Sequence, residues 1–71
     1  MDKRITVTIA SGGPEGNIFM ILTKVRQEMR KRQLIQAYND LRDDVTNSHS
    51  YADAIARIRQ DINLIDTDGA I

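Results

Sequence analysis

The stretch that decides the fold passes from an alternating segment through a cluster of turn residues into a helical pattern: Arg4-Ile5-Thr6-Val7-Thr8-Ile9-Ala10-Ser11-Gly12-Gly13-Pro14-Glu15-Gly16-Asn17-Ile18-Phe19. In its first part, Ile5, Val7 and Ile9 alternate with threonines, and all five side chains are β-branched. Alternation with a period of two places the apolar side chains on one side of an extended chain. The pattern predicts a half-buried β-strand over residues 4–10.

The cluster after the strand favours a turn, because glycine and proline interrupt both strands and helices. Pro14 suits the first turn of a helix, where its missing N–H group costs nothing. The period then changes to 3.6 residues, which predicts an amphipathic helix over residues 15–31. Its apolar stripe consists of Ile18, Ile21, Leu22, Val25 and Met29.

Two further helices are predicted downstream, over residues 33–45 and 51–64, followed by a tail over residues 66–71. Ser50 and Asp53 have the spacing of a capping box, which marks the start of the last helix. Residues 30–33 contain no helix breaker, so one long helix remains open as an alternative. A tight turn is favoured there, because a bent pair of helices buries both apolar stripes.

The chain has 71 residues and no cysteine, which predicts a single domain over residues 1–71 without disulfides. A domain this small needs additional stabilisation, and self-association is the remaining route. We therefore expect an α+β protomer of one N-terminal strand and three amphipathic helices, with the strand paired between subunits of an oligomer. Residues 64–67 are the only candidate for a second strand. Met20, Ile35 and Leu64 lie off the apolar stripes, as subunit contacts would, although isolated surface apolar residues are common.

Ten basic and ten acidic residues cancel, so no overall charge draws the protein to nucleic acid or to a membrane. Residues 1–32 nevertheless carry seven basic and three acidic side chains, a net charge of +4, and residues 33–71 carry three and seven, a net charge of −4. This separation fits either an anion site or docking between the two halves or between subunits. The lack of cysteine and of a long apolar segment favours a cytoplasmic location.

The glycine-rich turn is the first candidate binding site. Backbone N–H groups of Gly12, Gly13, Gly16 and Asn17 lie between a strand and a helix N-terminus, a place that suits a phosphate group. The alternative is purely structural: the glycines allow the turn, and Glu15 complements the helix dipole. A Glu15 carboxylate pointing inward would also repel a phosphate.

The second candidate site is an arc on the first helix made by Phe19, Thr23, Arg26 and Arg30. At 100° per residue these side chains share one side of the helix. An aromatic ring beside two guanidinium groups can stack on a base and neutralise phosphates. The alternative is that Phe19 is buried at a subunit interface and the arginines are its solvated neighbours.

Catalytic chemistry has little material in one copy of the chain. His49 lies in a polar loop without an implied partner, and Asp43 and Asp44 point about 100° apart on a helix. No cluster of cysteine and histidine predicts a metal, and no motif predicts a cofactor. We therefore expect a protein that is not an enzyme.

The stretch Gly13-Pro14-Glu15-Gly16-Asn17-Ile18-Phe19 resembles a loose group of small bacteriophage and prophage proteins, in which a Gly-Pro-x-Gly-Asn-aromatic turn joins a strand to helices. The resemblance implies a phage setting and no particular activity. Together with the two candidate sites it leads to the hypothesis of a phage-encoded binding protein that sequesters an anionic, nucleotide-like signal of host defence. The alternative hypothesis is an adaptor or inhibitor that binds a host protein and no small molecule.

Overall fold

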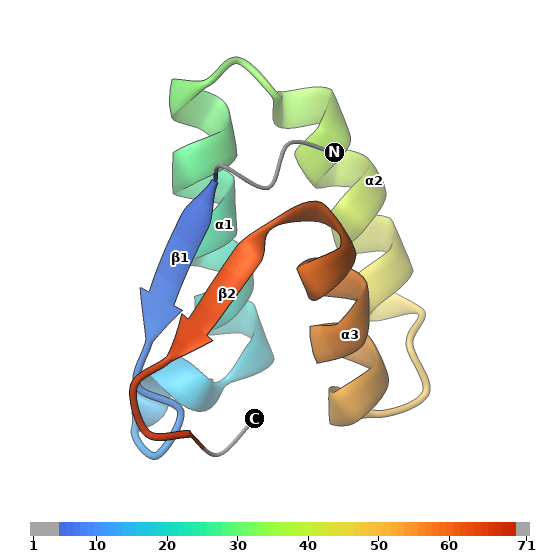
Figure 1. The fold of residues 1–71 in the computed structure, drawn as a ribbon. Coiled ribbons are helices and arrows are strands. Elements are labelled where there is room, and N and C mark those ends of the chain that lie inside the picture. Colours follow the sequence, from blue (N-terminus) through green and yellow to red (C-terminus); the bar gives the residue numbers. More distant parts are fainter. Residues whose placement is uncertain (1–4, 70–71) are drawn as a thin grey trace.

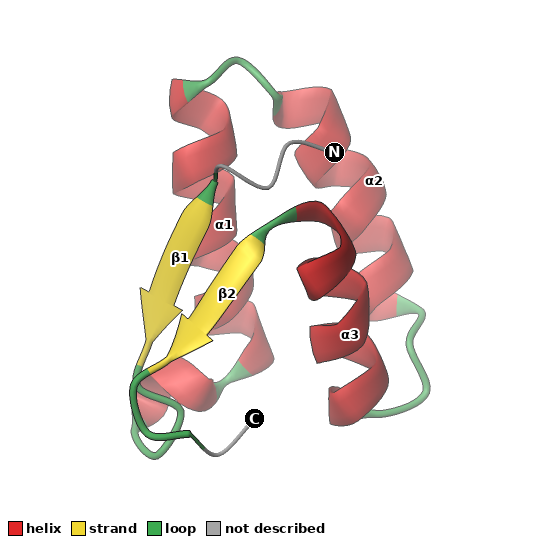
Figure 2. Ribbon diagram, viewed as in Figure 1, coloured by secondary structure: helices red, strands yellow, loops and turns green. Residues whose placement is uncertain are grey.

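The computed structural model describes residues 5–69, which form a two-stranded parallel sheet with three α-helices on one of its faces (Figures 1 and 2). Along the chain the elements are as follows: β1 (Thr6–Ile9), the 3₁₀ turn η1 (Pro14–Gly16), α1 (Ile18–Lys31), α2 (Ile35–Thr46), α3 (Tyr51–Asp61) and β2 (Asn63–Asp66). The α+β class, the N-terminal strand and the three helices are as predicted. Of the predicted strand, Arg4 lies outside the described residues, as do residues 70–71 of the predicted tail.

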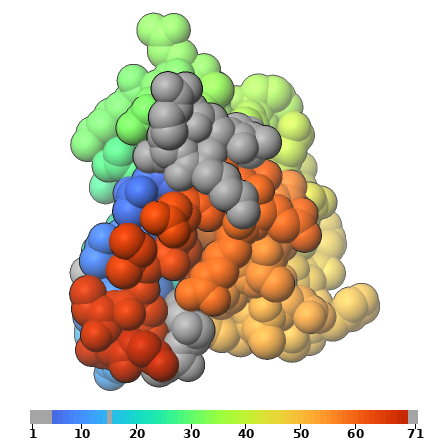
Figure 3. All heavy atoms as spheres, viewed as in Figure 1, coloured from blue at the N-terminus to red at the C-terminus, as the bar shows by residue number. Residues whose placement is uncertain are grey.

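The sheet pairs the two ends of the described chain, with Thr6 opposite Asn63 and Ile9 opposite Asp66. Val7, Ile9 and Leu64 are buried against the helices, whereas the side chains on the other face are exposed: Thr6, Thr8, Asn63 and Ile65. Residues of both strands are visible on the surface in Figure 3. One face of the sheet is therefore covered by the protein's own helices, and the other is open.

The strand β2 corrects two predictions. The third helix, expected to reach residue 64, ends at Asp61, and residue 66 of the expected tail belongs to β2. Ile62 and Leu64 are buried while Asn63 is exposed, so this short run also alternates with a period of two. Short apolar runs fit both periods, and here the pairing with β1 decides between them. Leu64 is thus a core residue, with a side chain only 5% exposed, and the predicted role as a subunit contact is wrong for it.

Helix α1 buries the predicted stripe from Ile21 to Met29 against the sheet and α2, and Ile18 packs at its margin. The helix begins three residues later than predicted. The Asn17 side chain caps it by accepting a hydrogen bond of 2.8 Å from the Phe19 N–H group, which is a common way to satisfy a free donor at a helix start.

A tight turn separates α1 from α2, so the favoured prediction of two helices is confirmed over one long helix. Gln33 has a φ of 60°, in the left-handed region. The Gln33 N–H donates to the Arg30 carbonyl at 3.1 Å and the Leu34 N–H donates to the Met29 carbonyl at 2.8 Å. These two bonds define a Schellman motif, and Leu34 packs at the edge of the core as that motif's apolar residue usually does.

Helices α2 and α3 are joined by a side-chain network around Arg57. Its Nε lies 2.7 Å from Asp44 Oδ2 on α2, and its Nη1 lies 3.0 Å from Asp61 Oδ2 on α3. Hydrogen bonding, mainly to Asp44 and also to Asp61, raises the pKa of Arg57 above its ordinary value, against the opposing effect of burial.

The start of α3 is capped as predicted, because Ser50 Oγ accepts a hydrogen bond from the Asp53 N–H group.

Among the described residues, none of the helices combines the length and the apolar composition that a membrane span requires.

The strained residue between α1 and α2 yields a stability prediction. Replacing Gln33→Gly should stabilise the fold by about 1 kcal/mol, because a left-handed conformation costs a side-chain-bearing residue roughly 1–2 kcal/mol and costs glycine little. Thermal unfolding should show a melting temperature higher by about 4–8 °C. Gln33→Ala is the matched control and should give no such gain, since alanine keeps the strain. Equal melting temperatures for the glycine and alanine variants would contradict the prediction.

Candidate functional site

The glycine-rich turn lies where the carboxyl ends of the two parallel strands meet. Asp66, the last residue of β2, accepts hydrogen bonds from the Ser11 N–H at 3.0 Å and from Ser11 Oγ at 2.5 Å. Asp68 Oδ2 accepts a hydrogen bond of 2.6 Å from the Gly12 N–H. The first donors of the turn are therefore bound to carboxylates of the same chain.

Further along the turn, the N–H groups donate to backbone carbonyls. Gly13 N donates to Ala10 O, Gly16 N donates to Gly13 O, and Asn17 N donates to Pro14 O, each at 3.1 Å. A phosphate bound at this turn would have to displace these bonds or the carboxylates of Asp66 and Asp68. The negative charge of the two carboxylates also opposes an anion at this position. The predicted role of Glu15 stays a prediction, because its side chain lies outside the described part of the structure.

Gly16 is required by close packing. A Cβ atom on Gly16 would lie 2.2 Å from the carbonyl oxygen of Ser11, which leaves no room for any side chain. The carbonyl of Gly16 also accepts a hydrogen bond of 2.6 Å from the Tyr51 hydroxyl, at the start of α3. Gly13, in contrast, has only Ala10 O within 4 Å of such a Cβ, at 3.8 Å. Gly16 thus joins the end of β1, the start of α1 and the start of α3.

The second predicted site is a continuous exposed surface on α1, referred to here as the arginine face: Phe19, Thr23, Arg26 and Arg30. Phe19 is 67% exposed, the highest value among the large apolar side chains described. Thr23 Oγ1 donates to the Phe19 carbonyl at 2.9 Å, which keeps this hydroxyl close to the helix backbone. Along the helix axis, Arg26 lies about 10 Å from Phe19 and Arg30 about 16 Å from it.

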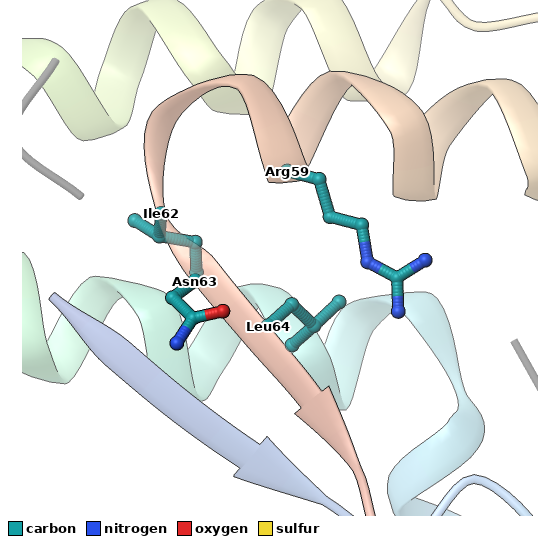
Figure 4. A pocket seen from close by; sticks show the side chains of 4 residues that line it. All are labelled: Arg59, Ile62, Asn63 and Leu64. Carbon is teal, nitrogen blue, oxygen red and sulfur yellow. The ribbon is translucent and has the colours of Figure 1, made fainter. Parts of the chain in front are cut away.

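The two predicted sites are adjacent in sequence but do not form one pocket. The first N–H groups of the turn bind Asp66 and Asp68 and the later ones bind backbone carbonyls, whereas the arginine face is open to solvent. Two hollows of about 260 Å³ each lie elsewhere. One is lined by Arg59, Ile62, Asn63 and Leu64, and in Figure 4 the Arg59 side chain extends from α3 beside Leu64 of β2.

The other hollow lies between the start of α1, the end of α2 and the start of α3, and is lined in part by His49. Its other lining residues are Ile18, Val45, Ser48, Ser50, Tyr51 and Ala54. The hydroxyls of Ser48, Ser50 and Tyr51 are already engaged in hydrogen bonds within the chain. No group of three or more potential metal ligands occurs among residues 5–69.

Sequence reasoning did not place Asp66, Asp68 and Tyr51 at the turn. Asp66 and Asp68 flank Thr67 directly after an apolar run, which is the position of polar residues at the carboxyl end of a strand. The position of Asp66 and Asp68 at the turn can be predicted only if residues 63–66 are assigned to a strand instead of a helix.

Comparison of the chain with models of protein families, with curated proteins and with solved structures found no match. What the molecule does must therefore follow from its own residues.

The contrast between two glycines of the turn can be tested directly. Gly16→Ala should destabilise the fold by about 2–3 kcal/mol, because the new methyl group would overlap the Ser11 carbonyl. Gly13→Ala should change the stability by less than about 0.5 kcal/mol, since its Cβ meets only an ordinary contact. Urea unfolding of the two variants measures both values. Equal stabilities would show that the turn opens to accept a side chain.

Proposed function

We propose that this protein is a small non-enzymatic binding protein and that its arginine face on α1 recognises an anionic, nucleotide-like ligand. The observation that carries the proposal is the exposure of Phe19 on the same side of one helix as Arg26 and Arg30. A large aromatic ring that the fold leaves in water is available for stacking, and base–aromatic stacking contributes about 1–3 kcal/mol per base.

The arginines supply the charge that the ligand needs. Arg26 and Arg30 are exposed, and their planar guanidinium groups can donate two hydrogen bonds at once to a phosphate. A base on Phe19 leaves its own phosphate within reach of Arg26, two turns further along the helix. Arg30, one turn beyond, suits a second phosphate, which favours a ligand with more than one phosphate group.

In this proposal the glycine turn has a supporting role. Its donors are bound to Asp66, Asp68 and backbone carbonyls, so Gly12, Gly13, Gly16 and Asn17 act by setting the position of α1. Asn17 caps the helix two residues before Phe19 and thereby fixes the first turn, which carries the ring. Direct contact between the turn and a phosphate requires the two carboxylates to move away.

The resemblance to small phage proteins suggests a setting for this activity. A small protein made in quantity would lower the concentration of a nucleotide signal of host defence by binding it, without any chemical step. This biological role is part of the proposal and rests on the resemblance, whereas the ligand class rests on the arginine face.

A second candidate function is an adaptor or inhibitor that binds a host protein. It is favoured by the exposure of further large apolar side chains outside the arginine face, since Met20 is 44% exposed and Ile35 is 42% exposed. Exposed apolar side chains mark a protein-binding surface where they form a contiguous patch, and Met20 and Ile35 are the residues from which such a patch would be built. This function predicts a stable host partner and indifference to nucleotides.

Calorimetric titration with a panel of linear and cyclic nucleotides separates the two functions. The wild-type protein should bind at least one phosphate-rich nucleotide, and Phe19→Ala and Arg26→Ala should each weaken that binding about tenfold or more, which corresponds to a loss of about 1.4 kcal/mol or more. Arg42→Ala, a change to an exposed arginine on α2, is the matched control and should bind as the wild type does. No binding by any member of the panel up to high micromolar concentration, together with a host protein retained by the wild type, would favour the adaptor.

The role of the turn can be tested with the same ligands. Asp68→Ala removes the acceptor of the Gly12 N–H and leaves the arginine face unchanged. We expect nucleotide affinity within about twofold of the wild type, because the phosphates bind Arg26 and Arg30. An increase of tenfold or more would instead place a phosphate at the turn and show that Asp68 competes with it.

A further inference from the structure

The outer edge of β1 carries backbone groups that point away from β2. The Asn63 N–H donates to the Ile5 carbonyl and the Thr67 N–H donates to the Ile9 carbonyl, each at 2.9 Å, so odd-numbered residues of this segment face β2. In a strand, the backbone N–H and C=O groups of successive residues point to opposite edges. The backbone groups of Thr6 and Thr8 therefore face away from β2. In Figure 1, β1 lies at the border of the molecule, with β2 on its other side and α1 behind it.

We propose that this edge pairs with the β1 edge of a second copy of the chain, in antiparallel orientation about a two-fold axis at Val7. The sequence of the segment supports this occupant, because Ile5-Thr6-Val7-Thr8-Ile9 reads the same in both directions. An axis at Val7 therefore places Thr6 opposite Thr8 of the second copy, and Ile5 opposite Ile9. Thr6 of one copy and Thr8 of the other then form a hydrogen-bonded pair, in which the N–H group of each donates to the C=O group of the other.

The same axis would join the two sheets into one sheet of four strands. Strand order becomes β2–β1–β1–β2, a sheet with both β1 strands in its interior, and the helices of both copies lie on one face. Thr6 and Thr8 form a cross-strand ladder on the open face, an arrangement that stabilises antiparallel pairs. The edge of β2 is less suited to self-pairing, since it carries Asp66 and lies beside Arg59.

Helix α1 contributes to this interface through the side that faces the β1 edge. Lys24 Nζ lies 3.3 Å from the Thr8 carbonyl, which identifies that side. Met20 is one turn earlier on the same side and is 44% exposed, so a second copy would cover it. Lys24 occupies the acceptor that the second copy needs, and a lysine at a strand edge generally opposes pairing. Because a carbonyl oxygen can accept two hydrogen bonds, Lys24 limits the strength of the association without blocking the Thr8 carbonyl entirely.

Sedimentation of the full chain over a range of concentrations tests the proposal. The wild type should show a mass twice that of the 8.0 kDa chain at high micromolar concentration. Thr6→Pro, which removes an outward-facing N–H group, should weaken association about tenfold or more beyond the matched variant Thr6→Ala, which keeps that group and loses only the side-chain contact with Thr8 of the second copy. Lys24→Met should strengthen association several-fold.

Three results would overturn the proposal: a wild type that remains a monomer at these concentrations, a Thr6→Pro variant that associates as strongly as Thr6→Ala, or a Lys24→Met variant with no gain. Amide hydrogen exchange of the wild type provides a second measurement if Thr6→Pro fails to fold. The Thr6 and Thr8 amides should become more protected as the concentration rises, and constant protection would equally exclude this edge. Nucleotide binding by the arginine face does not depend on any of these outcomes.

Discussion

The pairing of β1 with β2 is the constraint on which the remaining structure depends. It joins Thr6–Ile9 to Asn63–Asp66, so the chain between them must fold back as three helices over one face of the sheet. A two-stranded sheet is marginal in water, and this one persists because Ile5, Val7, Ile9 and Leu64 are buried against the helices. The strands and the helices thus stabilise each other, and neither part would bury its apolar side chains alone.

Parallel pairing also determines what surrounds the glycine-rich turn. Because both strands run in the same direction, the residues that follow β2 lie beside the residues that follow β1, and Asp66 and Asp68 reach the N–H groups of Ser11 and Gly12. A turn that would otherwise attract an anion is neutralised by the chain's own carboxylates. In the proposed function, recognition of an external anion is assigned to the arginine face, whose side chains are exposed on α1.

The helical part of the fold could be predicted from the sequence because long amphipathic patterns are unambiguous. The buried stripe of α1 and the Ser50 cap of α3 follow from local signals, whereas the turn at Gln33 was favoured only because a bent pair of helices buries both apolar stripes. The strand β2 was foreseen only as a candidate at residues 64–67, and its pairing with β1 could not be predicted in this way. Its short apolar run fits a helix as well as a strand, and only the partner at residues 6–9, far away in the sequence, decides between them.

The candidate site was predictable to a similar extent. Helical spacing alone placed Phe19, Arg26 and Arg30 on one side of α1, because spacing within a helix is a local property. The hydrogen bonds of the turn to Asp66 and Asp68 could not be foreseen, since they depend on the long-range pairing of the strands.

The separation of β1 and β2 in the sequence also sets the order in which the parts of the fold can form during synthesis. The helical hairpin can form early from local contacts, whereas the β-branched segment at residues 5–9 stays unpaired until residues 63–66 have been made. During that interval the nascent chain exposes an unpaired β-branched segment, and segments of this kind are prone to associate with other chains.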